Sequence, residues 1–189
     1  MGLGSLDIAV PVLGIAAWSG TGKTTLLVRV LPLLRERGLR VGLVKHAHHT
    51  FDVDTPGKDS YELRAAGASP VLVASRLRWA MMTETPSAAE PALADLLARF
   101  DASEVDLILV EGFKHEAFPK LELYRAAVGR PPTYPEDPDV LAVATDGPLD
   151  IPPRVPVLDL NRPEEVAEFV TGFVALWRAQ RPGSKGGPT

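Results

Sequence analysis

Short apolar runs alternate with segments of helical periodicity along most of the chain. A continuous apolar run is typical of a strand that is buried on both faces of a parallel sheet. Apolar residues spaced three and four positions apart are typical of an amphipathic helix. Strands are therefore predicted over residues 12–17, 39–45, 105–112, 120–124, 140–144 and 155–158. Helices are predicted over residues 24–37, 59–66 and 87–100, and a last one follows a cap at residues 161–164.

Two β segments in the middle of the chain depart from this alternation. Residues 70–74 and 78–82 are separated by a short polar stretch, which is typical of a hairpin, and they would add an antiparallel ribbon to an otherwise parallel sheet. The alternation elsewhere predicts a three-layer α/β/α fold with a mostly parallel sheet. Residues 1–11 are expected to form a flexible leader, and residues 181–189 a disordered tail.

The stretch AWSGTGKT, at residues 17–24, lies between the first predicted strand and the first predicted helix. It fits the phosphate-binding pattern Gly-x-x-x-x-Gly-Lys-Ser/Thr with Ala17 at the first position, and it predicts a P-loop NTPase fold for a nucleotide-binding domain over residues 12–180. Its glycines let backbone N–H groups point at phosphate oxygens at the positive end of the helix. The alternative is a glycine-rich turn with an incidental lysine. The residues expected to bind phosphate are Ser19, Gly20, Thr21, Gly22, Lys23, Thr24 and Thr25.

A nucleotide site of this kind also needs a metal ion and a second carboxylate. Lys23 would reach the terminal phosphates, which gives it a catalytic role, and the Thr24 hydroxyl would bind Mg²⁺. Glu111 ends a strongly apolar predicted strand, where a metal-binding acid ordinarily stands; its alternative is a solvent-exposed strand end. Asp54, together with Asp52, lies in the loop after the second strand. Asp54 is a second candidate for the metal and for catalysis, and an ordinary acidic loop is the alternative.

Asp146 follows the late strand predicted over residues 140–144. A carboxylate there would accept hydrogen bonds from the two N–H groups on the Watson–Crick edge of guanine, a pattern that adenine does not offer. The chain lacks a full Asn-Lys-x-Asp guanine motif. An Asx turn before Pro148 is therefore an equal alternative for Asp146.

The loop after the second strand is rich in cations and imidazoles. His46, His48 and His49 are three of the four histidines. Their spacing is not a zinc pattern, and histidines beside a phosphate loop more often bind anions or line a switch segment, although a structural metal is the alternative. His49 and Lys58 are expected to contact the nucleotide. A positive rim suited to a second phosphorylated ligand would comprise Lys45, Lys58, Lys114 and Arg64, with scattered solvated side chains as the alternative.

Composition narrows the class of protein. The chain has 189 residues, 46 % of them hydrophobic, and a formal net charge of −4, so no nucleic-acid backbone is expected as a partner. Cysteine is absent, which excludes disulfides and thiolate metal sites and fits a reducing cytoplasm. No apolar stretch is long enough for a membrane span, and no signal peptide is recognisable. A soluble cytoplasmic protein is predicted.

With these residues in place, the chain resembles the MobB family of molybdopterin-guanine dinucleotide biosynthesis adapter proteins. The resemblance covers roughly residues 12–180 and is carried by AAWSGTGKTTL, GLVKHAHHTFDVDTPGKDSYELRAAGA, RWAMMTETP and DLILVEGFKHE. It implies a homodimeric GTP-binding protein with weak hydrolysis that works beside a MobA-type guanylyltransferase, which joins GMP to a molybdopterin ligand. It also implies phosphate and Mg²⁺ binding by residues 20–25, a metal role for Glu111 and Asp54, and contacts of the loop over residues 46–59 with nucleotide or with the partner's ligand.

The predicted function is therefore a GTP- and Mg²⁺-binding adapter in molybdenum cofactor biosynthesis, at most a weak GTPase. A small-molecule kinase is the alternative from another class, because the same loop and basic rim would support one if Asp54 were the general base. A third hypothesis is that the protein is a scaffold whose phosphate loop is vestigial. Preference for guanine over adenine depends mainly on the family resemblance.

Overall fold

A computed structural model describes residues 8–47, 51–85 and 90–181. The chain divides into two compact units. The first unit comprises Met1–His46 and Ala92–Thr189, and the second comprises Ala47–Pro91. Each unit is described by itself.

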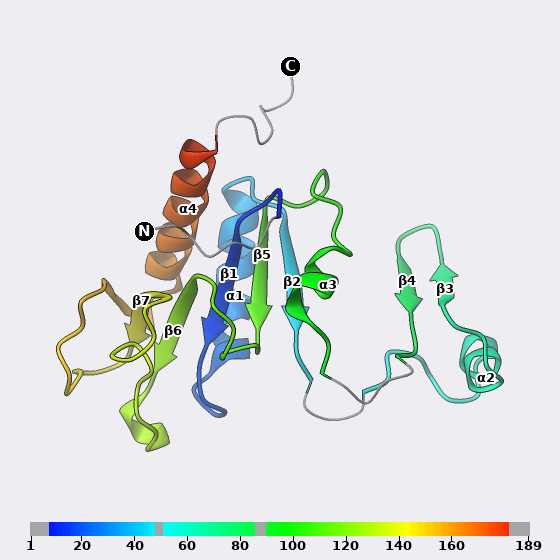
Figure 1. Cartoon of the computed structure of the whole chain (residues 1–189), viewed down its shortest axis with the longest axis horizontal. Coiled ribbons are helices and arrows are strands. Elements are labelled where there is room, and N and C mark those ends of the chain that lie inside the picture. The colour runs from blue at the N-terminus through cyan, green and yellow to red at the C-terminus, as the bar shows by residue number, and fades with distance from the viewer. Residues whose placement is uncertain (1–7, 48–50, 86–89, 182–189) are drawn as a thin grey trace. The chain divides into compact units, whose positions relative to one another are not determined.

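A six-stranded sheet forms the centre of the first unit, and all of its neighbouring strands run parallel (Figure 1). The strand order is β2-β5-β1-β6-β7-β8, so the strand that leads into the phosphate loop is a central one. The carboxyl ends of parallel strands meet at one edge, where ligands bind in open α/β sheets. The strands are β1 (Val12–Ala16), β2 (Val41–Lys45), β5 (Leu107–Glu111), β6 (Lys120–Tyr124), β7 (Val140–Thr145) and β8 (Val157–Asp159).

Apolar side chains cover both faces of this sheet. In β5, Leu107 and Leu109 belong to one buried cluster, whereas Ile108 and Val110 belong to another. Successive side chains of a strand point to opposite faces, so a strand buried on both faces reads as a continuous apolar run. The interpretation of residues 105–112 as a buried parallel strand is confirmed.

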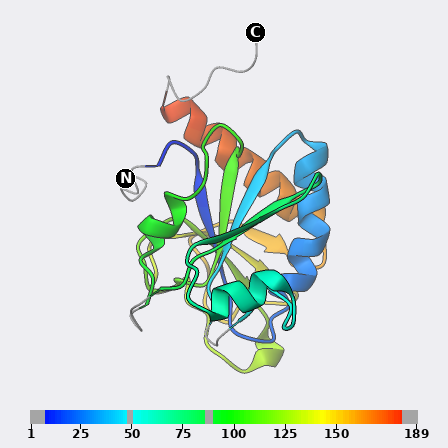
Figure 2. The same ribbon diagram turned by 90° about the vertical axis from the view of Figure 1, so that its right-hand side faces the viewer.

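Helices lie on both faces of the sheet (Figure 2). On one face, α1 (Lys23–Glu36) and α4 (Pro163–Gln180) pack against each other and against the larger cluster. On the other face, α3 (Leu93–Leu97) buries Leu93 and Leu97. A short 3₁₀ helix, η1 (Ala126–Val128), follows β6. The predicted three-layer α/β/α architecture is confirmed.

The helix predicted over residues 87–100 is wrong in its extent. The observed helix begins only at Leu93 and ends at Leu97. Pro91 disfavours helical dihedral angles in the residue before it, and Glu90 is not helical. Residues 87–89 of the predicted helix lie outside the described residues. Among the described residues, no helix is both long and apolar enough to cross a membrane.

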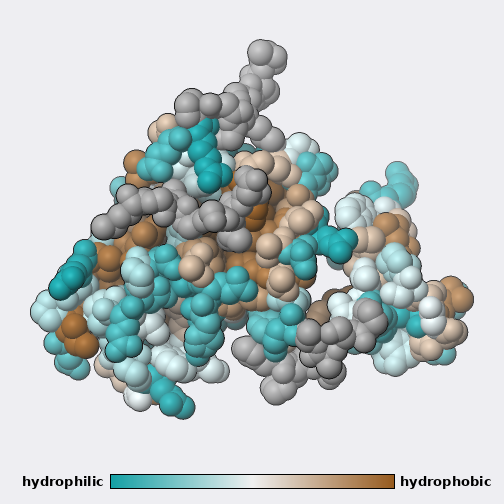
Figure 3. Space-filling model, in the orientation of Figure 1, coloured by the Kyte–Doolittle hydropathy of each residue, from teal (hydrophilic) through white to brown (hydrophobic). Residues whose placement is uncertain are grey.

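The second unit comprises α2 (Asp59–Ala65) and a hairpin of β3 (Val71–Ala74) and β4 (Trp79–Met82). The hairpin is antiparallel, which confirms the prediction, and it forms a two-stranded sheet of its own. None of the described residues of this unit is buried. Hydrophobic residues therefore appear on its surface in Figure 3. The large apolar side chains exposed there include Leu72, Val73, Leu77, Trp79 and Met81.

Candidate functional site

The phosphate loop leads from the end of β1 into the first turn of α1. Gly20 and Gly22 have φ angles of 84° and 97°, in the left-handed region that favours glycine. A Cβ atom at Gly20 would meet nothing within 4 Å. The backbone conformation, and not a shortage of space, therefore requires glycine at this position.

The N-terminus of α1 is available to an anion. Gly22 is its N-cap and provides no side-chain hydrogen bond, and the first turn contains no acidic residue. The first N–H groups of a helix have no intrahelical partner and carry positive potential, so a phosphate group fits there. Nζ of Lys23 donates to the carbonyl oxygen of Ala17 at 3.2 Å, which places the ammonium group across the loop. Thr24 and Thr25 are exposed beside it.

Glu111 lies at the carboxyl end of β5, between the ends of β1 and β2. It pairs in register with Ile15 of β1 and Lys45 of β2, and its side chain is 16 % exposed. Lys45 Nζ stands 3.9 Å from Oε2 of Glu111. The sheet therefore brings Glu111 next to the strand that carries the phosphate loop, which is where a metal-binding acid is expected. Because β5 separates β2 from β1, the loop after β2 does not follow a direct neighbour of β1.

Arg125 is a site residue that the sequence analysis missed. Its Nε donates to the carbonyl oxygen of Thr21 in the phosphate loop at 2.9 Å, and its Nη1 forms a short ion pair with the carboxylate of Asp146. Arg125 directly follows the predicted strand 120–124, so its place at the ligand edge of the sheet is the signal that would have identified it. The guanidinium group connects the phosphate loop to the end of β7.

Asp146 is thus held at the carboxyl end of β7 by a charged partner. Both side chains of the pair are about one-third exposed, at 32 % for Arg125 and 29 % for Asp146. The turn after β7 is formed by the Thr145 hydroxyl, which donates to the carbonyl oxygen of Gly147 at 3.0 Å and accepts from its N–H at 3.3 Å. No Asx turn by Asp146 is therefore needed to explain this turn.

The loop over residues 129–139 is attached to β6 by two buried charged residues. Glu122, which is 1 % exposed, accepts hydrogen bonds from the N–H groups of Thr133 at 2.6 Å and Tyr134 at 2.7 Å. Lys120, which is 2 % exposed, pairs with Asp137 at 2.9 Å. Burial raises the pKa of the Glu122 carboxyl group above its ordinary value, and the two N–H donors oppose this shift.

In the second unit, the acidic residues of the predicted site are held by local partners. Asp52 accepts a hydrogen bond from the N–H of Asp54 and pairs with Arg64 at 2.6 Å; these two interactions lower its pKa. Oδ1 of Asp54 accepts from the Thr55 N–H at 2.9 Å and the Ser60 hydroxyl at 3.0 Å. Oδ2 of Asp54 is buried and has no hydrogen-bond partner.

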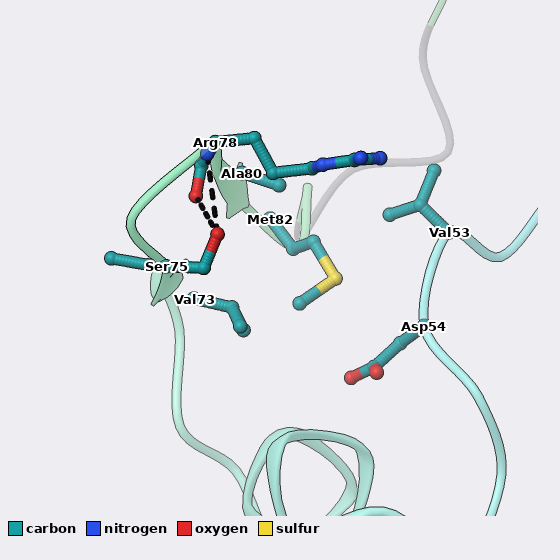
Figure 4. Close-up of a pocket in the computed structure, with 8 residues that line it drawn as sticks. Val53, Asp54, Val73, Ser75, Arg78, Ala80 and Met82 are labelled. Atoms are coloured by element: carbon teal, nitrogen blue, oxygen red, sulfur yellow. Dashed lines mark hydrogen bonds between the residues drawn. The ribbon is translucent and has the colours of Figure 1, made fainter.

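Asp54 also borders a hollow of about 310 Å³ between its loop and the hairpin. Its carboxylate points toward the side chains of Val73 and Met82 (Figure 4). Lys58 lies just before α2, as its N-cap. His48 and His49 lie outside the described residues. The hollow is lined by Val53, Asp54, Val73, Ala74, Ser75, Arg78, Ala80 and Met82.

The ligands that the first unit could offer to a metal ion are oxygen atoms at the phosphate loop and at the end of β5. Over residues 8–47, 51–85 and 90–181, no group of three or more His, Cys, Asp or Glu side chains is placed to hold a metal ion. Mg²⁺ at a phosphate site keeps several waters and takes only one or two protein ligands in addition to phosphate oxygens. Thr24, at the start of α1, and Glu111, at the end of β5, are the residues of the first unit that could supply such ligands.

Comparison with known proteins identifies the family. Residues 12–146 match the family described as Molybdopterin guanine dinucleotide synthesis protein B, MobB. The chain belongs to the MobB family. The resemblance inferred from the sequence motifs is therefore confirmed.

Two relatives are similar over nearly their whole length. The molybdopterin-guanine dinucleotide biosynthesis adapter protein of Escherichia coli is 56 % identical over 166 residues, which are 87 % of this chain and 94 % of that protein. The Haemophilus influenzae protein of the same name is 47 % identical over 174 residues, covering 91 % and 94 %. A crystal structure of molybdopterin-guanine biosynthesis protein B superposes with a TM-score of 0.66 at 28 % identity, covering 85 % of this chain and 98 % of that one.

Replacing Glu122 with Gln tests whether the buried carboxylate holds the loop over residues 129–139. A Gln side chain accepts from only one of the two N–H groups and turns its NH₂ group toward the other, so E122Q is expected to lower the free energy of unfolding by about 1–3 kcal/mol. Urea unfolding measures this loss. Glu168→Gln, on the exposed face of α4, is the control and should change stability little.

The same variant has a defined pH dependence. Because the folded pKa of Glu122 is raised, the native state binds more protons than the unfolded state above pH 4.5, the ordinary value of the group. The stability of the wild type relative to E122Q should therefore fall as the pH rises from there through the folded pKa of Glu122. If the stability of the wild type relative to E122Q instead rose with pH in this window, the raised pKa of Glu122 would be contradicted.

Proposed function

We propose that this MobB-family chain is a GTP- and Mg²⁺-binding adapter in the assembly of molybdopterin guanine dinucleotide, and that it holds GTP with slow turnover. The observation that carries the proposal is the connection, through Arg125, of a phosphate loop to a carboxylate at the end of β7. One end of this arrangement suits a triphosphate, and the other suits a base. The relatives' printed name, biosynthesis adapter protein, supports the pathway.

At one end of the site, several kinds of group would bind the negatively charged phosphates of the nucleotide. Backbone N–H groups of the loop and of the first turn of α1 would surround the phosphate oxygens. Lys23 would move from the Ala17 carbonyl to the terminal phosphates. Thr24 and Glu111 would hold Mg²⁺ between the protein and the phosphates, with Glu111 acting directly or through a bound water.

Asp146 would select guanine at the other end. One carboxylate oxygen pairs with Arg125, which fixes the orientation of the group. The other oxygen is then available to accept hydrogen bonds from the N1–H and N2–H₂ groups of guanine. Adenine presents an acceptor at N1 and would leave the carboxylate facing a lone pair.

Slow turnover is supported by the state of the predicted general base. A kinase or a fast GTPase needs a group that orients the attacking oxygen. Asp54, the candidate for that role, already accepts two hydrogen bonds at Oδ1 from its own unit. Oδ2 has no hydrogen-bond partner but is buried within the same unit. The contacts at Oδ1 and the burial of Oδ2 favour a structural role for Asp54, and with it a protein that holds the nucleotide rather than one that transfers its phosphate.

The hairpin supports a homodimer. Val73, Ala80 and Met82 lie on one face of the ribbon, and Leu72 and Met81 lie on the other, so both faces are apolar. A two-stranded hairpin is marginally stable alone in water, and none of the described residues of this unit is buried. A second copy of the chain would supply the missing apolar partner, and a MobA-type guanylyltransferase with its pterin ligand would bind this dimer.

Nucleotide binding is tested by thermal unfolding and isothermal titration. GTP with Mg²⁺ at a hundred times its dissociation constant should stabilise the wild type by about 2.7 kcal/mol. Lys23→Ala should remove the shift because it removes the cation that meets the terminal phosphates. ATP should bind more weakly than GTP. Equal binding of ATP, or no binding of GTP, would refute the proposal, and a phosphorylated small molecule would favour the kinase alternative.

Guanine selection is tested by changing the hydrogen-bond pattern at position 146. Asp146→Asn replaces one acceptor with an NH₂ donor, which matches the C2 carbonyl group of xanthine and no longer matches the amino group of guanine. The variant should lose GTP affinity and gain XTP affinity, each by about tenfold or more, since one charged hydrogen bond contributes about 1.5–3 kcal/mol. Titrations with GTP and with XTP measure these two changes in affinity. An unchanged preference for GTP would exclude Asp146 as the base-reading residue.

The dimer is tested by sedimentation. Leu72→Asp places a charge on one apolar face of the hairpin and should shift the chain from dimer to monomer at micromolar concentration. Leu176→Asp, at an equally exposed leucine on α4, is the matched control and should leave the dimer intact. A wild-type chain that sediments as a monomer would contradict the homodimer.

A further inference from the structure

Three side chains meet at the edge of the phosphate loop and have no part in the proposed function. Trp18 is the second residue of the loop motif. Lys114 Nζ stands 4.2 Å from the centroid of its ring, and Cζ of Arg130 stands 5.4 Å from the same centroid. Because β1 lies between β5 and β6, the segments after these two strands bring one cation each to Trp18, the second residue after β1.

The indole ring is held in a fixed position. Its Nε1–H donates to the carbonyl oxygen of Pro131 at 2.9 Å, and Trp18 is half-buried. Pro131 and Arg130 belong to the loop over residues 129–139, which the buried side chains of Glu122 and Lys120 attach to β6. The ring that both cations approach is therefore positioned in advance of any ligand.

The two cations lack compensating charge. Lys114 and Arg130 are exposed, and within residues 8–47, 51–85 and 90–181 neither pairs with an acidic side chain. Lys45 and Arg125, which lie at the same edge of the sheet, each have an acidic partner. Two like charges at one aromatic ring repel each other, and an anion bound by both would offset that repulsion with two attractions.

The geometry points to a second anion site, formed by Trp18, Lys114 and Arg130 beside the phosphate loop, and we propose that it binds a phosphate group. An Arg guanidinium group offers a planar pair of donors to phosphate oxygens, and a Lys ammonium adds a point charge. The phosphate would come either from the terminal position of the bound nucleotide or from a phosphate monoester of a second ligand. The first of these sources rests on the proposed function.

The test compares wild type with the double variant Lys114→Ala, Arg130→Ala by isothermal titration. GDP affinity should be unchanged, which shows an intact phosphate loop. If the site takes the terminal nucleotide phosphate, the variant should bind GTP about tenfold more weakly. If it takes a separate ligand, phenyl phosphate should bind GDP-loaded wild type and bind the variant about tenfold more weakly, with GTP affinity unchanged. Unchanged affinity for both probes overturns the proposal.

Two controls separate this site from a general charge effect and from misfolding. Arg99→Ala with Arg154→Ala removes two exposed cations elsewhere in the first unit and should leave both affinities unchanged. Lys114→Arg with Arg130→Lys keeps the charges and should retain phosphate binding; loss in either control overturns the assignment to this cluster. If neither GDP nor GTP binds, the proposed function fails, but phenyl phosphate binding to Lys23→Ala still tests the anion site.

Discussion

Burial of β1 on both faces of a parallel sheet is the constraint on which the site depends. Leu13 and Ile15 pack under α1 and α4, and Val12 packs on the opposite side with the α3 cluster. This burial fixes the end of the strand, so the loop that follows must turn at Gly20 and Gly22 to enter α1. The same arrangement puts the ends of β5, β6 and β7 at the edge where the loop lies.

Charged side chains at this edge are arranged by neighbouring strands. Glu111 comes from β5, Arg125 follows β6, and Asp146 follows β7, so the two acids Glu111 and Asp146 stand on opposite sides of β1. Arg125 connects the second of these acids to the loop itself. A nucleotide that spans the edge would contact its phosphates and its base through one rigid framework, which suits holding and presentation better than rapid hydrolysis.

The second unit differs from the first in how its polar and apolar side chains are distributed. Its ordered contacts are mainly polar, centred on Arg64 with Asp52 and Glu84, while its apolar hairpin side chains remain at the surface. Exposed apolar area of this kind is typical of a surface that binds another protein. The apolar side chains of the hairpin are therefore exposed, whereas those of the first unit's sheet are buried.

The sequence by itself determined the strands, most helices, the hairpin and the phosphate loop, because continuous apolar runs, helical spacing and the Gly-Lys-Thr pattern are local signals. It also indicated Glu111, because an apolar run that ends in an acidic residue can be recognised from one short segment of sequence. Only the tertiary structure decided the contacts of Arg125 and Trp18. Thr21 and Arg125 are separated by 104 positions, and Trp18 and Pro131 by 113. Strand order and register bring such residues together, and no local pattern encodes either.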